Sequence, residues 1–446
     1  MRDGSGLWGG SGANGVDGRP RSRGAGGPGT DELERVDAAA GQPAAEVVVT
    51  GIGVAAPNGL GAGAWWRALL AGTNGIRPIS RFDASGYPVR IAGEIAGFVD
   101  EDHIPSRLLP STDRVTRLGL VAAKEALEDS GADPAALPRY GVGVITASAT
   151  GGTEFGQRGL EALWGKGAKY VSAYQSFAWF HAANTAQISI RHALRGPATA
   201  VVSEQAGGID AIARARREIR KGASLMVTGG VDSALCPWGW AAHLADGRMT
   251  TAADPDRAYL PFADAAGGHV VGEGGALLVL EDAAAAAARG ATGYGVVAGC
   301  AATFDGGPDL PRLREAAELA LADARLAPHD VDVVFADAAG ERAADRAEAA
   351  ALAALFGPYG VPVTAPKSMT GRLGAGGSSL DVAAALLALR EGVVPPTTGT
   401  VRAAADYGLD LVTGAPRRLP GLRTALVLAR GRGGFNSAAV VRAVGA

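Results

Sequence analysis

Cysteine and long apolar runs are scarce in this chain, and their scarcity narrows the classes of protein it can be. The 446 residues include two cysteines, Cys236 and Cys300, so neither a disulfide framework nor a thiolate metal site is expected. No run approaches the roughly 18 apolar residues of a membrane-spanning helix, and the N-terminal residues lack the apolar core of a signal peptide. We therefore expect a soluble cytoplasmic protein.

An excess of positive charge is also missing. The 42 lysine and arginine residues against 45 aspartate and glutamate residues give a net charge of −3, and no strongly basic block indicates a nucleic-acid-binding surface. The sequence contains neither the phosphate-binding pattern GxxxxGK followed by Ser or Thr nor the zinc-binding pattern HExxH, and its potential metal ligands are not clustered. We expect no bound metal or nucleotide, and neither nucleic acid nor membrane as a partner.

The chain divides by composition into a tail and two similar halves. Residues 1–44 contain twelve glycines and few apolar groups, so we expect a disordered tail. Beyond it, short β-branched runs alternate with Ala-rich helical segments, which is typical of an α/β fold with buried strands. Five runs precede a poly-Ala helix at 283–288 and five follow it, which predicts a duplicated architecture with halves at 45–290 and 291–446. The runs lie at 47–54, 141–148, 198–205, 224–231, 275–282, 293–302, 331–338, 362–368, 424–431 and 438–444.

Two strand-to-helix turns occupy equivalent places in the two halves. Residues 203–208 read SEQAGG, and residues 367–372 read KSMTGR. Such turns are where α/β folds place reactive groups, because the free N–H groups and the dipole of the following helix favour developing negative charge. Gln205 takes the position where a nucleophile would be expected.

Longer motifs surround these turns from about Val47 to Arg442. They include VTGIG at 49–53, ATGG at 149–152, YQSFAWF at 174–180, NTAQISIRHALRGP at 184–197, VTGGVDSALCPWGW at 227–240, DPDRAYLPF at 254–262, GEGGALLVLED at 272–282, ADAAG at 336–340 and LARGRGGFNSA at 428–438. Together with the turns, they resemble the β-ketoacyl synthase family, and more narrowly the chain-length factor (KSβ) subunits of bacterial type II aromatic polyketide synthases. The resemblance implies the thiolase fold, with two similar βαβαβαββ halves in a layered α-β-α-β-α arrangement.

The resemblance also implies that this chain lacks the family's catalytic groups. An active member uses a Cys in the first turn as acyl acceptor, since a helix N-terminus lowers the pKa of the thiol, and two His residues from the second half. Here Gln205 stands in the Cys place, Ala339 in the first His place and Arg372 in the second. Arg432 stands where active members carry a Phe whose backbone N–H helps to bind the thioester oxyanion. A carboxamide cannot form a thioester, so no catalytic residue is assigned with certainty.

The resemblance implies that this chain is a non-nucleophilic partner of an active ketosynthase subunit (KSα). The heterodimer would elongate a poly-β-ketone, carried on the phosphopantetheine of an acyl carrier protein, by decarboxylative Claisen condensations in antibiotic biosynthesis. This chain would bind no cofactor of its own and would shape the tunnel that sets product length. The alternative is a malonyl-carrier-protein decarboxylase that supplies the acetyl primer, with the Gln205 amide stabilising the thioester oxygen. Gln205 could equally be a buried amide that fills an unused pocket.

Residues of the tunnel and of the dimer interface are also assigned by the resemblance. Thr153, Gly156 and Leu160 match tunnel positions, and their spacing places them on one helical face; Trp238 matches another wall residue. The small groups at the first three positions predict a deep tunnel and a product longer than an octaketide, namely a decaketide or a dodecaketide. The alternative is that these three residues pack the core. Four aromatic residues are expected at the dimer interface, with a core stripe as the alternative. They are Tyr174, Phe177, Trp179 and Phe180.

Overall fold

The computed structural model describes residues 45–307 and 311–445, and the expected tail at 1–44 lies outside the described residues. Ten strands form the main part of its large mixed sheet. In the first half they are β1 (Val47–Ala56), β5 (Val142–Ala147), β6 (Ala198–Val201), β7 (Leu225–Asp232) and β8 (Gly274–Asp282). In the second half they are β9 (Gly295–Phe304), β10 (Val333–Phe335), β11 (Pro362–Thr364), β15 (Thr424–Gly431) and β16 (Phe435–Arg442). Each of the ten predicted runs overlaps one of these strands.

The strands repeat one topology twice. The order is β1-β8-β7-β5-β6 in the first half and β9-β16-β15-β10-β11 in the second. In each half the first two pairings are antiparallel and the next two are parallel. The halves join where β1 pairs with β9. This repeated order agrees with the duplication expected from the sequence.

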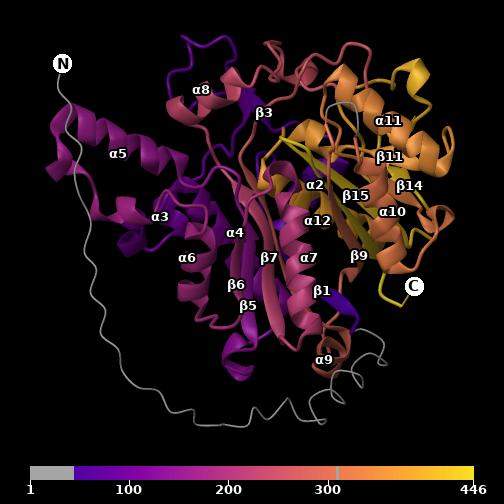
Figure 1. Ribbon diagram of the computed structural model, residues 1–446, viewed down its shortest axis with the longest axis horizontal. Coiled ribbons are helices and arrows are strands. Elements are labelled where there is room, and N and C mark those ends of the chain that lie inside the picture. The colour runs from indigo at the N-terminus through magenta and orange to yellow at the C-terminus, as the bar shows by residue number, and fades with distance from the viewer. Residues whose placement is uncertain (1–44, 308–310, 446) are drawn as a thin grey trace, which may run out of the picture. The chain divides into compact units, whose positions relative to one another are not determined.

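Helices complete a five-layered arrangement (Figure 1). Two helices, α7 (Gly207–Arg220) and α12 (Ala375–Glu391), pack against each other and against strands of both halves, so they form the central layer. On the outer face of the first half lie α4 (Arg114–Ser130) and α6 (Ala183–His192). On the outer face of the second half lies α10 (Leu313–Ala324), with α11 (Arg342–Phe356) against it. Figure 1 shows α7 and α12 between the purple and magenta first half and the orange and yellow second half.

The remaining elements are short or lie at the rim of the sheet. The helices are α2 (Ala62–Leu70), α3 (Asp100–His103), α5 (Thr153–Lys166), α8 (Pro237–Ala245) and the poly-Ala helix α9 (Ala283–Ala288). The strands are β2 (Gly59–Leu60), β3 (Ile76–Pro78), β4 (Ile91–Gly93), β12 (Val393–Val394), β13 (Asp410–Leu411) and β14 (Arg417–Arg418). Within the described ranges, no helix combines the length and the apolar character needed to cross a membrane.

The central layer depends on small residues. In α12 every residue from Ala375 to Leu389 is buried, as expected for a helix that is apolar or small on all sides. The first turn of α7 lies so close to α12 that a Cβ on Gly208 would be 2.6 Å from Ser379 N and 2.7 Å from Ala375 O. Both of those atoms belong to the backbone, so a side chain at position 208 could fit only if one helix moved.

We predict that Gly208→Ala destabilises the protein by about 1–3 kcal/mol, because overpacking forces the central helices apart. Gly86→Ala is the matched control, since no atom lies within 4 Å of a Cβ built at Gly86. Urea unfolding of both purified variants measures the difference. Equal stability of the two would contradict the close approach of α7 and α12.

Candidate functional site

A cavity of about 430 Å³ lies at the carboxyl ends of β5 and β7. Its walls come from the residues that follow these two strands, from the first turns of α5, from one face of α8, and from the segments at 269–272 and 372–374. This volume falls within the range of pockets that hold small organic molecules. The cavity therefore brings together the end of one half of the sheet and the second predicted turn.

Three of the four predicted tunnel residues line this cavity: Thr153, Gly156 and Trp238. Gly156 packs against the indole, so that a Cβ at Gly156 would lie 3.0 Å from Cζ3 of Trp238. The N–H of Trp238 donates a hydrogen bond to Oε1 of Gln157 at 2.8 Å, which ties the start of α8 to α5. Leu160 lies one turn further along α5, outside the cavity wall, and is 41% exposed. The cavity thus faces only the beginning of α5.

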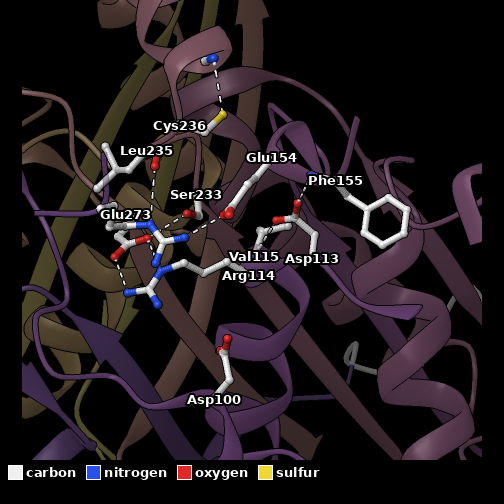
Figure 2. A network of polar contacts seen from close by, with 12 residues as sticks. Asp100, Asp113, Arg114, Val115, Glu154, Phe155, Ser233, Leu235, Cys236 and Glu273 are labelled. Atoms are coloured by element: carbon white, nitrogen blue, oxygen red, sulfur yellow. Dashed lines mark hydrogen bonds and ion pairs between the residues drawn. The ribbon is translucent and has the colours of Figure 1, made fainter. Parts of the chain in front are cut away.

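A buried carboxylate fixes the first turn of α5 (Figure 2). Asp113 caps α4 by accepting a hydrogen bond from Val115 N at 3.0 Å, and its other oxygen accepts one from Phe155 N at 2.7 Å. Burial raises the pKa of Asp113 to about 6, against the opposing effect of these hydrogen bonds. Glu154 adds an ion pair with Arg81 at 2.6 Å. These contacts hold the helix that carries Thr153 and Gly156.

A second buried pair holds the segment that leads into α8. Arg114 and Glu273 form an ion pair at 2.7 Å, and Ser233 Oγ donates to the same carboxylate at 2.7 Å. Burial opposes ionisation of Glu273, but the hydrogen bonds and charge of Arg114 outweigh it, and the pKa of Glu273 is lowered. Cys236 Sγ then caps α8 by accepting from Gly239 N at 3.5 Å. The position of Trp238 is therefore set by buried contacts on both sides of it.

Asp232 is the polar junction between the cavity wall and the central layer. It accepts hydrogen bonds from Ser148 Oγ at 2.8 Å, from the backbone N–H groups of Ala149 and Thr150, and from Ala375 N at 2.7 Å. Burial raises its pKa, while these donors act in the opposite direction. The sequence does not indicate this role, because Asp232 lies far along the chain from both groups of donors, residues 148–150 and Ala375.

Gln205 is fully buried and does not line the cavity. Both polar atoms of its amide lack a hydrogen-bond partner among the described residues. The amide lies against the first turn of α12, where a Cβ at Gly377 would be 2.3 Å from Nε2 of Gln205. The preceding residue, Glu204, has a φ of 50°, which is unusual for a side-chain-bearing residue. Its carboxylate accepts the backbone N–H of Arg432 at 2.9 Å, so that this N–H is already occupied.

In the second predicted turn, Arg372 forms a two-pronged ion pair with Asp337. Nη2 lies 3.0 Å from Oδ1, and Nη1 lies 3.2 Å from Oδ2. Burial favours the neutral form of Asp337, but the charges of Arg372 and Lys367 outweigh it and lower the pKa of Asp337. Ala339, which the resemblance puts in the first His place, is buried and offers no polar side chain. Asp337 was missed in the sequence, although it is the one acidic residue in the otherwise apolar segment VVFADAAG.

The four aromatic residues expected at an interface lie at the surface. Tyr174, Phe177, Trp179 and Phe180 are each between 39% and 52% exposed. They form two edge-to-face pairs, Tyr174 with Phe177 and Trp179 with Phe180. The outer edge of β6 is also exposed. Large exposed apolar groups and a free strand edge are each typical of an interaction surface.

Comparison with known proteins identifies the family. Residues 44–286 match the model of the beta-ketoacyl synthase N-terminal domain, and residues 294–400 match that of its C-terminal domain. The chain belongs to the β-ketoacyl synthase family. The thiolase fold expected for this family is confirmed by the layered structure and by the likeness to solved ketosynthases.

Individual relatives place the chain more narrowly within the family. The tetracenomycin polyketide synthase ketoacyl synthase beta subunit of Streptomyces glaucescens is 57% identical over 403 residues, which cover 89% of this chain and 98% of the relative. The alpha subunit of that synthase is 38% identical over 418 residues, with coverage of 89% and 96%. A solved structure, the ishigamide ketosynthase/chain length factor, superposes with a TM-score of 0.83 at 27% identity, over 90% of this chain and 100% of that one. The higher identity to the beta subunit confirms the resemblance to KSβ proteins.

We predict that Arg372→Met lowers the free energy of unfolding by about 3–5 kcal/mol, because it leaves Asp337 buried without a partner. The double variant Arg372→Met with Asp337→Asn should recover most of this loss, since Asn is neutral and keeps an oxygen for the N–H of Arg430, which Asp337 accepts at 2.9 Å. Urea unfolding of the two variants measures both effects.

The pH dependence supplies an independent check of this ion pair. Because the pKa of Asp337 is lowered in the folded protein, the pair stabilises the protein above the unfolded-state pKa of about 4 and stops doing so as pH falls through the folded value. The difference between the parent protein and Arg372→Met should therefore shrink below about pH 4. A difference that stays constant with pH would contradict the assignment.

Proposed function

We propose that this chain is the chain-length factor of a type II aromatic polyketide synthase, a non-nucleophilic subunit that pairs with an active KSα. The observation that carries the proposal is the cavity bounded by Thr153, Gly156 and Trp238, whose lining contains no cysteine among the described residues. Elongation on an acyl carrier protein needs a thiolate, and this chain supplies the wall of the chamber into which the product grows. The 57% identity to a relative named as a beta subunit supports this assignment.

The chain's own cysteines are poor candidates for the missing nucleophile. Cys236 is buried and Cys300 is half-buried, and desolvation raises the pKa of these thiols to about 11 and about 12. A thiol reacts through its thiolate, which is scarce at neutral pH when the pKa is so high. The acyl acceptor of each condensation therefore comes from the partner subunit.

The surface that receives KSα is the exposed aromatic cluster and the free edge of β6. An edge strand can extend its sheet into a second subunit by backbone hydrogen bonds, and aromatic side chains anchor the contact. Trp179 belongs to this cluster and also lines the cavity, so the cavity reaches the interface. A chain growing on the partner's cysteine can enter the cavity from this side.

The cavity acts on product length by its volume. Each condensation adds two carbons next to the thioester and pushes the first-made end of the chain away from the partner's cysteine. Growth stops when that end meets a wall that cannot move. Gly156 and Trp238 form the part of the wall that the chain passes first, and the segments that carry them are held by the buried contacts around Asp113 and Glu273.

The buried position of Gln205 favours this role over the decarboxylase alternative. An amide that stabilised a malonyl thioester would have to face the cavity, whereas Gln205 packs on α12 away from it.

We predict that Gln205→Met, which removes two unpaired buried polar atoms, leaves the complex at least as stable and leaves the rate of priming from malonyl carrier protein unchanged. If mass spectrometry shows that the Gln205→Met complex forms less acetyl carrier protein, the decarboxylase alternative is supported.

The length-setting role is tested by filling the cavity. We predict that Thr153→Phe combined with Leu160→Phe, and Gly156→Leu alone, shorten the product of the reconstituted complex by one or more two-carbon units. Since Leu160 lies outside the cavity, Thr153→Phe should account for most of the effect of the double variant. Liquid chromatography with mass spectrometry measures the product lengths.

Gly165→Ala is the matched control for the α5 variants, because it adds a side chain to the same helix where no atom lies within 4 Å. It should leave product length unchanged. If the filled variants assemble with KSα, remain active and make a product of unchanged length, the cavity does not set chain length.

A further inference from the structure

We propose that the cavity contains a terminal binding chamber, formed by His243, Arg248, His269 and Arg372, that hydrogen-bonds the carbonyl oxygens at the first-made end of the poly-β-ketone. The inference deepens the proposed function and rests on it. The polar end of the cavity thereby helps to select the longest products. We call these four residues the His269 chamber.

Helix α8 runs along one side of the cavity. Its residues Trp238, Ala242, His243 and Asp246 all line the cavity, and their spacing places them along one helical face. The rise from Trp238 to Asp246 is about 12 Å at 1.5 Å per residue. The contact of Gly156 with Trp238 thus lies at one end of this face, and the His269 chamber lies at the other. A chain that passes Trp238 enters a space long enough for several more two-carbon units.

His269 lines the cavity, and one nitrogen of its ring has no hydrogen-bond partner among the described residues. Its side chain is 13% exposed, and Nδ1 is buried without a hydrogen-bond partner among the described residues. Oε1 of Glu341 lies 4.0 Å from Nδ1, beyond hydrogen-bonding distance, and it accepts from Nε of Arg248 at 2.7 Å. A buried polar atom left in this state costs free energy unless a ligand or water pairs with it.

Both histidines of the chamber are neutral at physiological pH. Burial, together with the positive charges of Arg372 and Arg248, lowers the pKa of His269 well below its usual value. Burial also lowers the pKa of His243. A neutral imidazole offers one N–H donor and one acceptor nitrogen, which suits the ketone and enol oxygens of a poly-β-ketone.

The arginines around the chamber are already paired, so the site does not favour an anionic ligand. Arg372 is paired with Asp337, and Arg248 is paired with Glu341. Elsewhere in the cavity wall, Nη2 of Arg432 lies 3.0 Å from Oδ1 of Asp246. A malonyl carboxylate would find no unpaired positive charge there. The apolar side chains of Val271 and Leu373 complete the wall, as expected for a chain of alternating methylene and carbonyl groups.

The test replaces the histidine by an apolar residue of similar size. Complexes of KSα with the parent chain or with His269→Leu are supplied with malonyl carrier protein, and product lengths are measured by mass spectrometry. We expect the share of the longest product to fall about fivefold in His269→Leu, the effect of about one hydrogen bond to a neutral group. His269→Asn, which keeps an N–H donor and an acceptor, should restore part of that share. His329→Leu is the matched control, since the His329 side chain is 84% exposed and lies outside the cavity.

The outcomes separate this inference from the proposed function. If His269→Leu leaves product lengths unchanged while Gly156→Leu shortens them, the chamber is wrong and the chain-length role stands. If neither variant changes product length, the chain-length role itself fails. Should His269→Leu not assemble with KSα, His243→Leu decides, and an unchanged product distribution in that variant overturns the chamber. Shortening by Leu without recovery by Asn also contradicts hydrogen bonding as its cause.

Discussion

Asp337 and Arg372 are a charged pair that a buried environment tolerates only together. Each would carry a large desolvation cost alone, and their two-pronged contact offsets that cost. The pair occupies the turn at which the family's active members are expected to hold a catalytic histidine. It also closes one wall of the cavity, since Arg372 lines it. A single electrostatic constraint therefore gives the cavity a fixed boundary on this side.

The rest of the cavity is fixed by carboxylates whose partners come from distant segments. Asp113 connects α4 to α5, Glu273 connects α4 and β8 to the segment before α8, and Asp232 connects the end of β7 to α12. Each is buried and hydrogen-bonded, which makes it costly to displace. The walls that face a growing chain therefore cannot yield easily. This rigidity is what a subunit needs if it is to stop growth at a defined length.

Much of the fold could be predicted from the sequence, because its signals are local. The β-branched runs and the poly-Ala helix at 283–288 mark ten strands and the boundary between two similar series. The details of the site are not local. The segment ADAAG turns at Ala338, which has a φ of 50°. This turn decides which of its residues contacts Arg372, and the sequence alone did not identify Asp337. Helical spacing placed Leu160 on one face with Thr153, but the cavity ends before Leu160 because its depth is set by α8.

If condensation chemistry occurs on the partner while this chain supplies the wall, acyl intermediates form only on KSα. Peptide mass spectrometry of the working complex, quenched during elongation with malonyl carrier protein, tests this directly. We expect acyl groups on a cysteine of KSα and none on this chain, including its two cysteines. An acyl group bound to any residue of this chain, formed at the rate of product synthesis, would contradict it.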